Sequence, residues 1–187
     1  FYMPVVMSAV VVGMIWTNLL DSAGLVNSVL KALKIISKPI PFLTDRWGVL
    51  FSSMFVTIWL GLGYYMVIYL TALANIDESL YEAASLDGAG PVRQFIYVTM
   101  PGVRSTMMLI MMLSTIAAFR VFNEIYVLTN GSAGPGGMDM TMSMLIKREG
   151  TGIQARTGYA SAISIVVLVI VGVMLIVQQI LQKRGED

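Results

Sequence analysis

Residues 82–89 read Glu82-Ala83-Ala84-Ser85-Leu86-Asp87-Gly88-Ala89, and this polar segment continues to Pro101 between two long apolar runs. Ser79 and Glu82 have the three-residue spacing of a capping box, in which each side chain satisfies a backbone N–H group at a helix start. The segment therefore predicts a short helix that begins near Ser79 and ends near Asp87. Gly88 can then adopt the left-handed conformation that often follows a helix.

The predicted helix has one face of small residues. By the three-and-four periodicity of helices, this face holds Leu80, Ala83, Ala84, Asp87 and Gly88. Small side chains allow another surface to approach the backbone closely, so the face predicts a docking site for a partner. After it, Gly90-Pro91 predicts a turn and the first position of a second short helix.

The full spacing is Glu82-Ala83-Ala84, three residues, Gly88, nine residues, then Val98-Thr99-Met100-Pro101. It resembles the loop motif of the permease subunits of bacterial ATP-binding-cassette (ABC) importers, which has Ile and Leu where this chain has Val98 and Met100. Tyr81 and the segments 24–27, 87–89 and 122–131 resemble the carbohydrate branch of that family. Within it the chain is most similar to the subunit type that includes the larger membrane subunit of the maltose importer. The resemblance extends over essentially all 187 residues.

The resemblance implies an all-α membrane protein, a polytopic transmembrane helix bundle of the type I importer class in a bacterial or archaeal cytoplasmic membrane. It implies import of a sugar or oligosaccharide by alternating access. The chain itself would be no enzyme and bind no cofactor, since a separate ATPase subunit would use ATP and Mg²⁺. The implied partners are a second, related permease, two ATPase subunits, an extracytoplasmic solute-binding protein and the lipid bilayer. The residues implied in ATPase docking are Glu82, Ala83, Ala84, Asp87, Gly88, Ala89 and Pro101.

Composition independently points to a membrane protein. The chain is 57% hydrophobic and only 12% charged, against about 25% charged residues in a soluble domain. A net charge of +1 is too small to indicate nucleic-acid binding. Without cysteine or histidine, the sequence excludes disulfides, thiolate chemistry, a Cys/His zinc site and histidine proton relays. No catalytic constellation or metal site is predicted.

Apolar runs predict four membrane crossings at about residues 3–20, 49–73, 106–128 and 159–182 of a single domain, 1–187. Residues 74–105 would be the cytoplasmic coupling loop. Residues 25–33 carry an apolar helical stripe with Lys31, Lys34 and Lys38 off it, which predicts an interfacial amphipathic helix. Because the chain starts at Phe1 inside an apolar run, we expect N-terminal helices of the family to precede it.

Arg120 and Glu124 are the only charges within the predicted crossings. Such charges cost about 2.5 to 3.5 kcal/mol each on insertion scales, so they usually face protein or water. One interpretation places both near the end of the span, where Arg120 extends to the interface and can pair with Glu124. The other makes them part of a substrate path. That candidate path comprises Tyr64, Arg120, Asn123 and Glu124.

The glycine-rich segment 131–137 is not a phosphate loop, because no Lys-Ser/Thr pair follows it and no strand precedes it. By resemblance, residues 129–158 form the external loop that meets the solute-binding protein, and Lys183-Arg184 close the last span as a cytoplasmic anchor.

The motif and the distribution of Lys and Arg predict opposite orientations of the chain in the membrane. The motif requires residues 74–105 to be cytoplasmic, but more cations fall on the loops that would then be external, which is the reverse of the positive-inside rule. The cations are Arg93, Arg104, Lys183 and Arg184 on the motif side, against Lys31, Lys34, Lys38, Arg46, Lys147, Arg148 and Arg156.

Three other functions remain open. The solute could be a glycerol phosphate or a polyol. The chain could be an ion-coupled secondary carrier, which needs an intramembrane acid such as Glu124, or a membrane assembly factor without transport activity. The sequence names neither the solute nor homodimeric against heterodimeric pairing.

Overall fold

The computed structural model describes the backbone of residues 2–184 and the side chains of residues 2–182. All regular structure in that part of the chain is helical, which confirms the predicted all-α class. Lys183 and Arg184, predicted as an anchor, have side chains outside the described set. The elements are η1 (Met3–Val6), α1 (Ala9–Leu20), α2 (Leu25–Ala32), α3 (Arg46–Ala74), α4 (Glu78–Leu86), α5 (Pro91–Gln94), η2 (Phe95–Thr99), α6 (Met100–Gly102), α7 (Arg104–Phe119), α8 (Asn123–Leu128), η3 (Pro135–Gly137), α9 (Met142–Gly150) and α10 (Thr157–Arg184).

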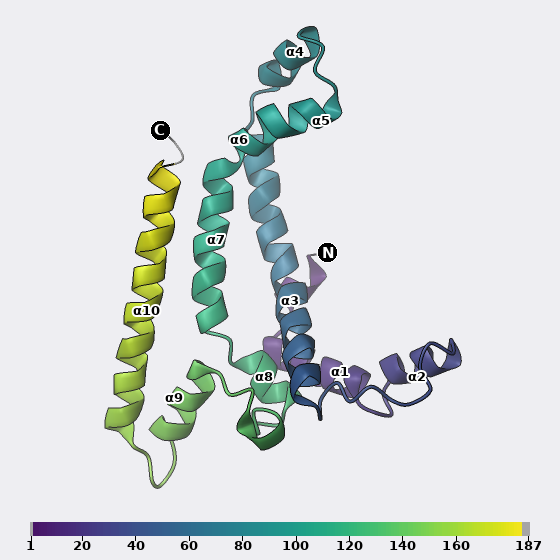
Figure 1. Cartoon of the computed structure of the whole chain (residues 1–187), viewed down its shortest axis with the longest axis vertical. Helices are drawn as coiled ribbons and strands as arrows, with labels where there is room; N and C mark the ends of the chain where they lie inside the picture. Colours follow the sequence, from purple (N-terminus) through teal and green to yellow (C-terminus); the bar gives the residue numbers. More distant parts are fainter. Residues whose placement is uncertain (1, 185–187) are drawn as a thin grey trace.

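Three long helices, α3, α7 and α10, run side by side along the long axis of the molecule (Figure 1). The α4–α5 segment and the C-terminal end of α10 lie at one end of this bundle. The segments around α2, α8 and α9 lie at the other end.

By length and composition, three described segments could cross a membrane: Ala9–Ala32, Arg46–Ala74 and Thr157–Gln182. A fourth is possible if Pro91–Gly102 and Arg104–Phe119, bent by 62° at their junction, count as one broken span. Many apolar side chains of α10 are exposed, Leu168 at 71% among them. A helix that is apolar on all sides needs lipid or other protein around it.

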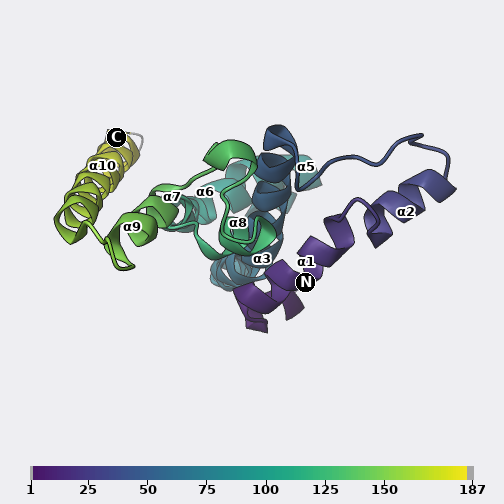
Figure 2. The same ribbon diagram turned by 90° about the horizontal axis from the view of Figure 1, so that it is seen from below.

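The crossing predicted at about residues 3–20 is not one continuous helix. The backbone is extended at Met7 and at Ser8, which precedes α1 as its N-cap, so η1 and α1 are separate. Alone, the 12 residues of α1 reach about 18 Å at 1.5 Å per residue, short of a hydrocarbon core of about 30 Å, so only α1 and α2 together, as Ala9–Ala32, have the length of a span. Figure 2 shows α1 and α2 extending away from the bundle.

The crossing predicted at about residues 106–128 is also not one continuous helix. Helix α7 ends at Phe119 with Arg120 as its C-cap, and α8 begins at Asn123 after a non-helical Phe122. Because the helix is interrupted between them, Arg120 and Glu124 are not brought together on one helical face. The two ion pairs among the described residues both use Glu149, so the predicted Arg120–Glu124 pair does not form.

The short helix α8 is the centre of the packing. One cluster of buried side chains joins Val12 of α1, Val56 of α3 and Leu128 of α8. A second joins Ile125 of α8 to Ala133 and Met144. These contacts fix the loop after α7 on the ends of α1 and α3.

Candidate functional site

The predicted docking segment forms a helical hairpin at the end of the molecule. Its first helix, α4, begins at Asp77, whose carboxylate accepts a hydrogen bond from the Ser79 backbone N–H at 2.9 Å. This bond lowers the pKa of Asp77. The predicted Ser79 capping box is therefore wrong: Asp77 takes the N-cap position, two residues earlier, and leaves Glu82 exposed in the middle of the helix.

The predicted C-terminus of α4 is confirmed. Gly88 has φ +74°, its N–H donates to the Ser85 carbonyl at 3.0 Å, and the Ala89 N–H donates to the Ala84 carbonyl at 2.9 Å. This pair of bonds is the Schellman motif, which requires a left-handed residue after the helix. The predicted start of the second helix is also confirmed, with Gly90 as N-cap and Pro91 at the first position.

The second helix of the hairpin is longer than predicted. Elements α5, η2 and α6 follow one another without interruption from Pro91 to Gly102, and η2 is a π-helix over Phe95–Thr99. Pro101 supplies a reason, because proline has no N–H and its ring clashes with the carbonyl four residues earlier; a wider π turn relieves both constraints. Pro101 thus lies in this second helix, not on α4.

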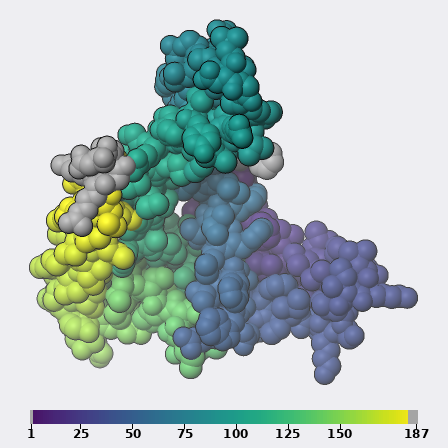
Figure 3. All heavy atoms as spheres, turned by 45° about the horizontal axis from the view of Figure 1, so that its top comes forward, coloured from purple at the N-terminus to yellow at the C-terminus, as the bar shows by residue number. Residues whose placement is uncertain are grey.

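The other predicted docking residues lie on a surface that the chain leaves open. No residue of α4 is buried, Leu86 is 90% exposed, and Ala84 and Ala89 are half-buried. A Cβ atom added to Gly88 would meet nothing within 4 Å. Figure 3 shows this teal segment projecting beyond the ends of the long helices. A partner could therefore reach the backbone at Gly88.

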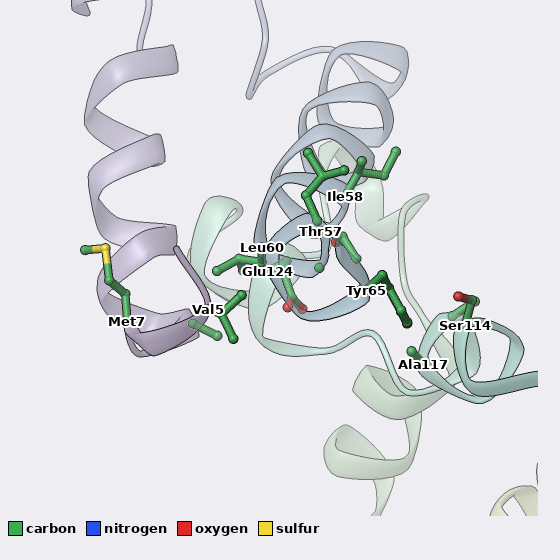
Figure 4. Close-up of a pocket in the computed structure, with 13 residues that line it drawn as sticks. Val5, Met7, Thr57, Ile58, Leu60, Tyr65, Ser114, Ala117 and Glu124 are labelled. Atoms are coloured by element: carbon green, nitrogen blue, oxygen red, sulfur yellow. The ribbon is translucent and has the colours of Figure 1, made fainter. Parts of the chain in front are cut away.

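A recess of about 590 Å³ lies between η1, α3, α7 and α8. We call it the central recess, and Figure 4 shows its lining side chains. Most of them are apolar. The polar ones are Thr57, Tyr65, Ser114 and Glu124, and Glu124 is the only charged side chain among them.

Tyr64, predicted for the substrate path, does not line this recess. Its ring is 48% exposed and packs edge-on against Tyr65, at 5.3 Å between centroids. Tyr65 lines the recess instead. Helical spacing could have identified it, because Tyr65 lies four residues after Gly61 and eight after Thr57, on the same face.

The other three predicted path residues line one smaller recess, of about 350 Å³, beside the break after α7. Arg120, Asn123 and Glu124 all contribute to it, and Glu124 also lines the central recess. Asn123 faces a third recess with Tyr126 and Lys147. There the Lys147 ammonium lies 4.0 Å from the centre of the Tyr126 ring, a contact that gave no signal in the sequence.

Residues 1–186 match a protein family described as the binding-protein-dependent transport system inner membrane component. The chain belongs to this family. An inner membrane component of such a system is a transmembrane part of a transporter, in agreement with the apolar helices of this chain.

The proteins to which this chain is similar include permeases of transport systems. This chain is 33% identical to the probable ABC transporter permease protein YurN of Bacillus subtilis over 188 residues. The match covers 100% of this chain and 63% of YurN. The chain is 32% identical to the lactose transport system permease protein LacF of Rhizobium radiobacter, covering 95% of this chain and 59% of LacF. The chain thus spans less than two thirds of the length of these relatives.

A solved structure has the same fold. A chain of a bacterial alginate ABC transporter, in complex with an alginate pentasaccharide-bound periplasmic protein, superposes with a TM-score of 0.81 at 25% identity. The superposition covers 98% of this chain and 62% of that one.

Proposed function

We propose that this chain belongs to the transmembrane subunit of an ABC importer that moves a carbohydrate across the cytoplasmic membrane by alternating access. A separate ATPase subunit hydrolyses ATP with Mg²⁺, so this chain binds no nucleotide and catalyses no reaction. The working assembly contains two related permease subunits, two ATPase subunits and an extracytoplasmic solute-binding protein.

The observation that carries this proposal is the hairpin at the end of the bundle. Its first helix is capped by Asp77 and by the Gly88 turn, yet buries none of its own residues. A short, ordered helix that leaves most of its surface exposed is suited to insertion into a groove of a partner. Glu82 and Asp87 offer carboxylates to that partner, while Ala83, Ala84, Gly88 and Ala89 permit close approach. Pro101 acts by shaping the second helix.

The lining of the central recess supports a neutral polyhydroxyl solute. Thr57, Tyr65 and Ser114 supply hydroxyl groups, and Glu124 supplies a carboxylate that can accept hydrogen bonds from solute hydroxyls. Within the central recess, which Arg120 does not line, this carboxylate repels a phosphate group, so the recess favours a sugar or oligosaccharide over a glycerol phosphate. The printed names of relatives agree, since they include permeases for lactose and for arabinooligosaccharides.

The proposal for the substrate path is revised accordingly. Glu124, Asn123 and Arg120 stay in it because they line connected parts of the same region. Tyr65 replaces Tyr64. The carboxylate of Glu124 also favours a second candidate function, an ion-coupled carrier, which would transport its solute without ATP.

The experiment is solute uptake by the complete transporter in liposomes, with ATP or with an ion gradient as the energy source. We expect ATP-dependent uptake, and we expect Gly88→Asp to abolish it while the subunits still insert. The added side chain meets nothing in this chain, although the left-handed backbone at Gly88 strains it, and it would collide with the partner. Co-purification of the ATPase measures docking directly.

Gly152→Asp is the matched control. Gly152 also has positive φ, +103°, and open space around it, but it lies at the opposite end of the bundle. It should retain the ATPase. Uptake driven by an ion gradient without ATP would support the carrier instead, and normal uptake by the Gly88→Asp variant would contradict docking through α4.

A further inference from the structure

Helix α4 is attached to the rest of the molecule by few contacts. None of its residues is buried, and the connection from it to Pro91 contains two glycines, Gly88 and Gly90. Such a connection bends easily, because glycine has a wide choice of backbone angles. If the chain connection alone held α4, a push on this helix would be absorbed there.

Two side-chain hydrogen bonds join α4 to the second helix of the hairpin. The hydroxyl groups of Tyr81 and Thr99 lie 2.8 Å apart. The Gln94 side-chain amide donates to the Ser85 hydroxyl at 2.8 Å and to the Ala89 carbonyl at 3.2 Å. Tyr81 and Ser85 are four residues apart, so both bonds leave from one face of α4.

This face differs from the proposed docking face. Ala83 and Asp87 lie on the exposed part of the docking face, while Tyr81 and Ser85 are turned toward the second helix, and half-buried Ala84 lies between the two. A partner could therefore occupy the first face without breaking either bond. Each side of α4 would have its own role, one for contact with the partner and one for attachment.

The bond from Tyr81 ends at a mechanically significant position. Thr99 is the last residue of the π-helix, two residues before Pro101 and four before Val103, where the chain bends by 62° into α7. The hydroxyl pair thus connects the first half of α4 to the end of the second helix that leads into α7.

We propose that Tyr81, Thr99, Ser85 and Gln94 are positioning residues that join α4 and the helix 91–102 into one rigid lever. This rests on the proposed function. Movement imposed on α4 by the ATPase is then transmitted to α7 through the second helix, because coupling between distant sites needs a contiguous element with two arrangements. The hydrogen bonds do not contact the solute or the nucleotide; they decide how much of the ATPase movement reaches the spans.

The test uses the complete transporter in liposomes with its solute-binding protein. Uptake of radiolabelled lactose and maltotriose is measured beside phosphate release from ATP, and the sugar that the wild type accumulates serves as the probe. Tyr81→Phe and Thr99→Val each remove one hydroxyl group and little else. Each should lower the number of sugar molecules moved per ATP by about fivefold, the effect of losing one net hydrogen bond. The double variant should lose no more than either single one.

Two variants control for unrelated effects. Tyr97→Phe removes a hydroxyl from the same π-helix at a side chain that is 76% exposed, and should leave the ratio unchanged. Thr99→Ser keeps the hydroxyl group and should also leave the number of sugar molecules moved per ATP unchanged.

If the Tyr81→Phe variant moved as many sugar molecules per ATP as the wild type, the proposal of a rigid lever would be wrong. Parallel losses of uptake, ATP hydrolysis and assembled complex would also overturn it, because these indicate a purely structural role. A wild-type complex that shows no ATP-driven uptake of any sugar would overturn the proposed function instead.

Discussion

The buried amide of Asn27 holds a 13-residue loop in place. Its side chain is 1% exposed; Nδ2 donates to the carbonyls of Asp21 and Ile40, each at 3.1 Å, and Oδ1 accepts from the Ile40 N–H at 2.8 Å. These bonds fasten the connection between α2 and α3 to the start of α2.

Asn27→Ala should therefore destabilise this end of the molecule. Removing the amide leaves the Ile40 N–H without its acceptor in a buried site, which costs about 1–3 kcal/mol. Thermal unfolding in detergent measures the loss, and Ser28→Ala, at the exposed neighbouring position, should change the midpoint little. An unchanged midpoint in the Asn27 variant would show that the loop is held by other contacts.

Glu149 joins α9 to α10 across their connecting loop. Its carboxylate accepts hydrogen bonds from Arg156, at 2.9 Å for Nε, and from Arg148. The bond from Arg156 is the main cause of a lowered pKa at Glu149, and the charges of both arginines add to it. A pKa lower in the folded than in the unfolded state stabilises this connection at neutral pH. That contribution is lost as the pH falls through the folded value.

Lowering the pH below the ordinary pKa of glutamate should consequently speed the hydrogen exchange of the backbone amides of residues 151–156. The rates are compared after correction for intrinsic exchange. Glu149→Gln cannot titrate, so its corrected exchange should be fast at neutral pH and insensitive to acid. An equal acid response in both proteins would exclude the carboxylate as the cause.

At the scale of elements, uninterrupted apolar composition predicts helices better than it predicts their breaks. Helices α3 and α10 lie close to the predicted runs 49–73 and 159–182, because neither contains a proline that would break the helix. The break after Val6 falls inside an equally apolar run, and the break after Phe119 falls at Arg120. They depend on the packing of α8 against α1 and α3, and contacts between distant segments leave no local pattern.

The closest approach between α1 and α8 gives a test of that packing. A Cβ atom at Gly13 would lie 2.8 Å from Cγ1 and 2.9 Å from Cβ of Val127. Gly13→Ala should force the helices apart and destabilise the protein by about 1–3 kcal/mol, as overpacked cores do. The thermal midpoint in detergent reports the change.

Gly172→Ala is the control within the same chain. Gly172 lies in α10 with nothing within 4 Å of an added Cβ, so alanine should be neutral or stabilising by up to about 1 kcal/mol. If both alanine variants behaved alike, α1 and α8 would not be packed as the structure shows.

At the scale of the whole molecule, the exposed hairpin was the most predictable part of the candidate site. Its turn depends on Gly88 and Gly90-Pro91, whose backbone preferences are local. The N-cap was misassigned because Asp77 and Ser79 both suit that position. Tyr65, Lys147 and the Tyr81–Thr99 bond require knowledge of which helices meet, and no spacing along the sequence contains that.

The proposed function depends on which side of the membrane the hairpin faces. The cations that favour the opposite orientation are partly engaged nearby: Arg148 and Arg156 bind Glu149, and Lys147 lies on Tyr126. These contacts do not change the count, because the positive-inside rule weighs Lys and Arg and gives acidic residues little weight. The proposed function, in contrast, requires a cytoplasmic hairpin.

These 187 residues contain no cysteine, so single cysteines can report this orientation. Leu86→Cys places a thiol on α4 and Ile153→Cys places one on the α9–α10 loop, both at strongly exposed positions at opposite ends of the bundle. A membrane-impermeant maleimide added to intact cells should label the thiol at 153 and reach the thiol at 86 only after permeabilisation. In membranes, the thiol at 86 should cross-link to the ATPase. Labelling at 86 in intact cells would place the hairpin outside and contradict the account.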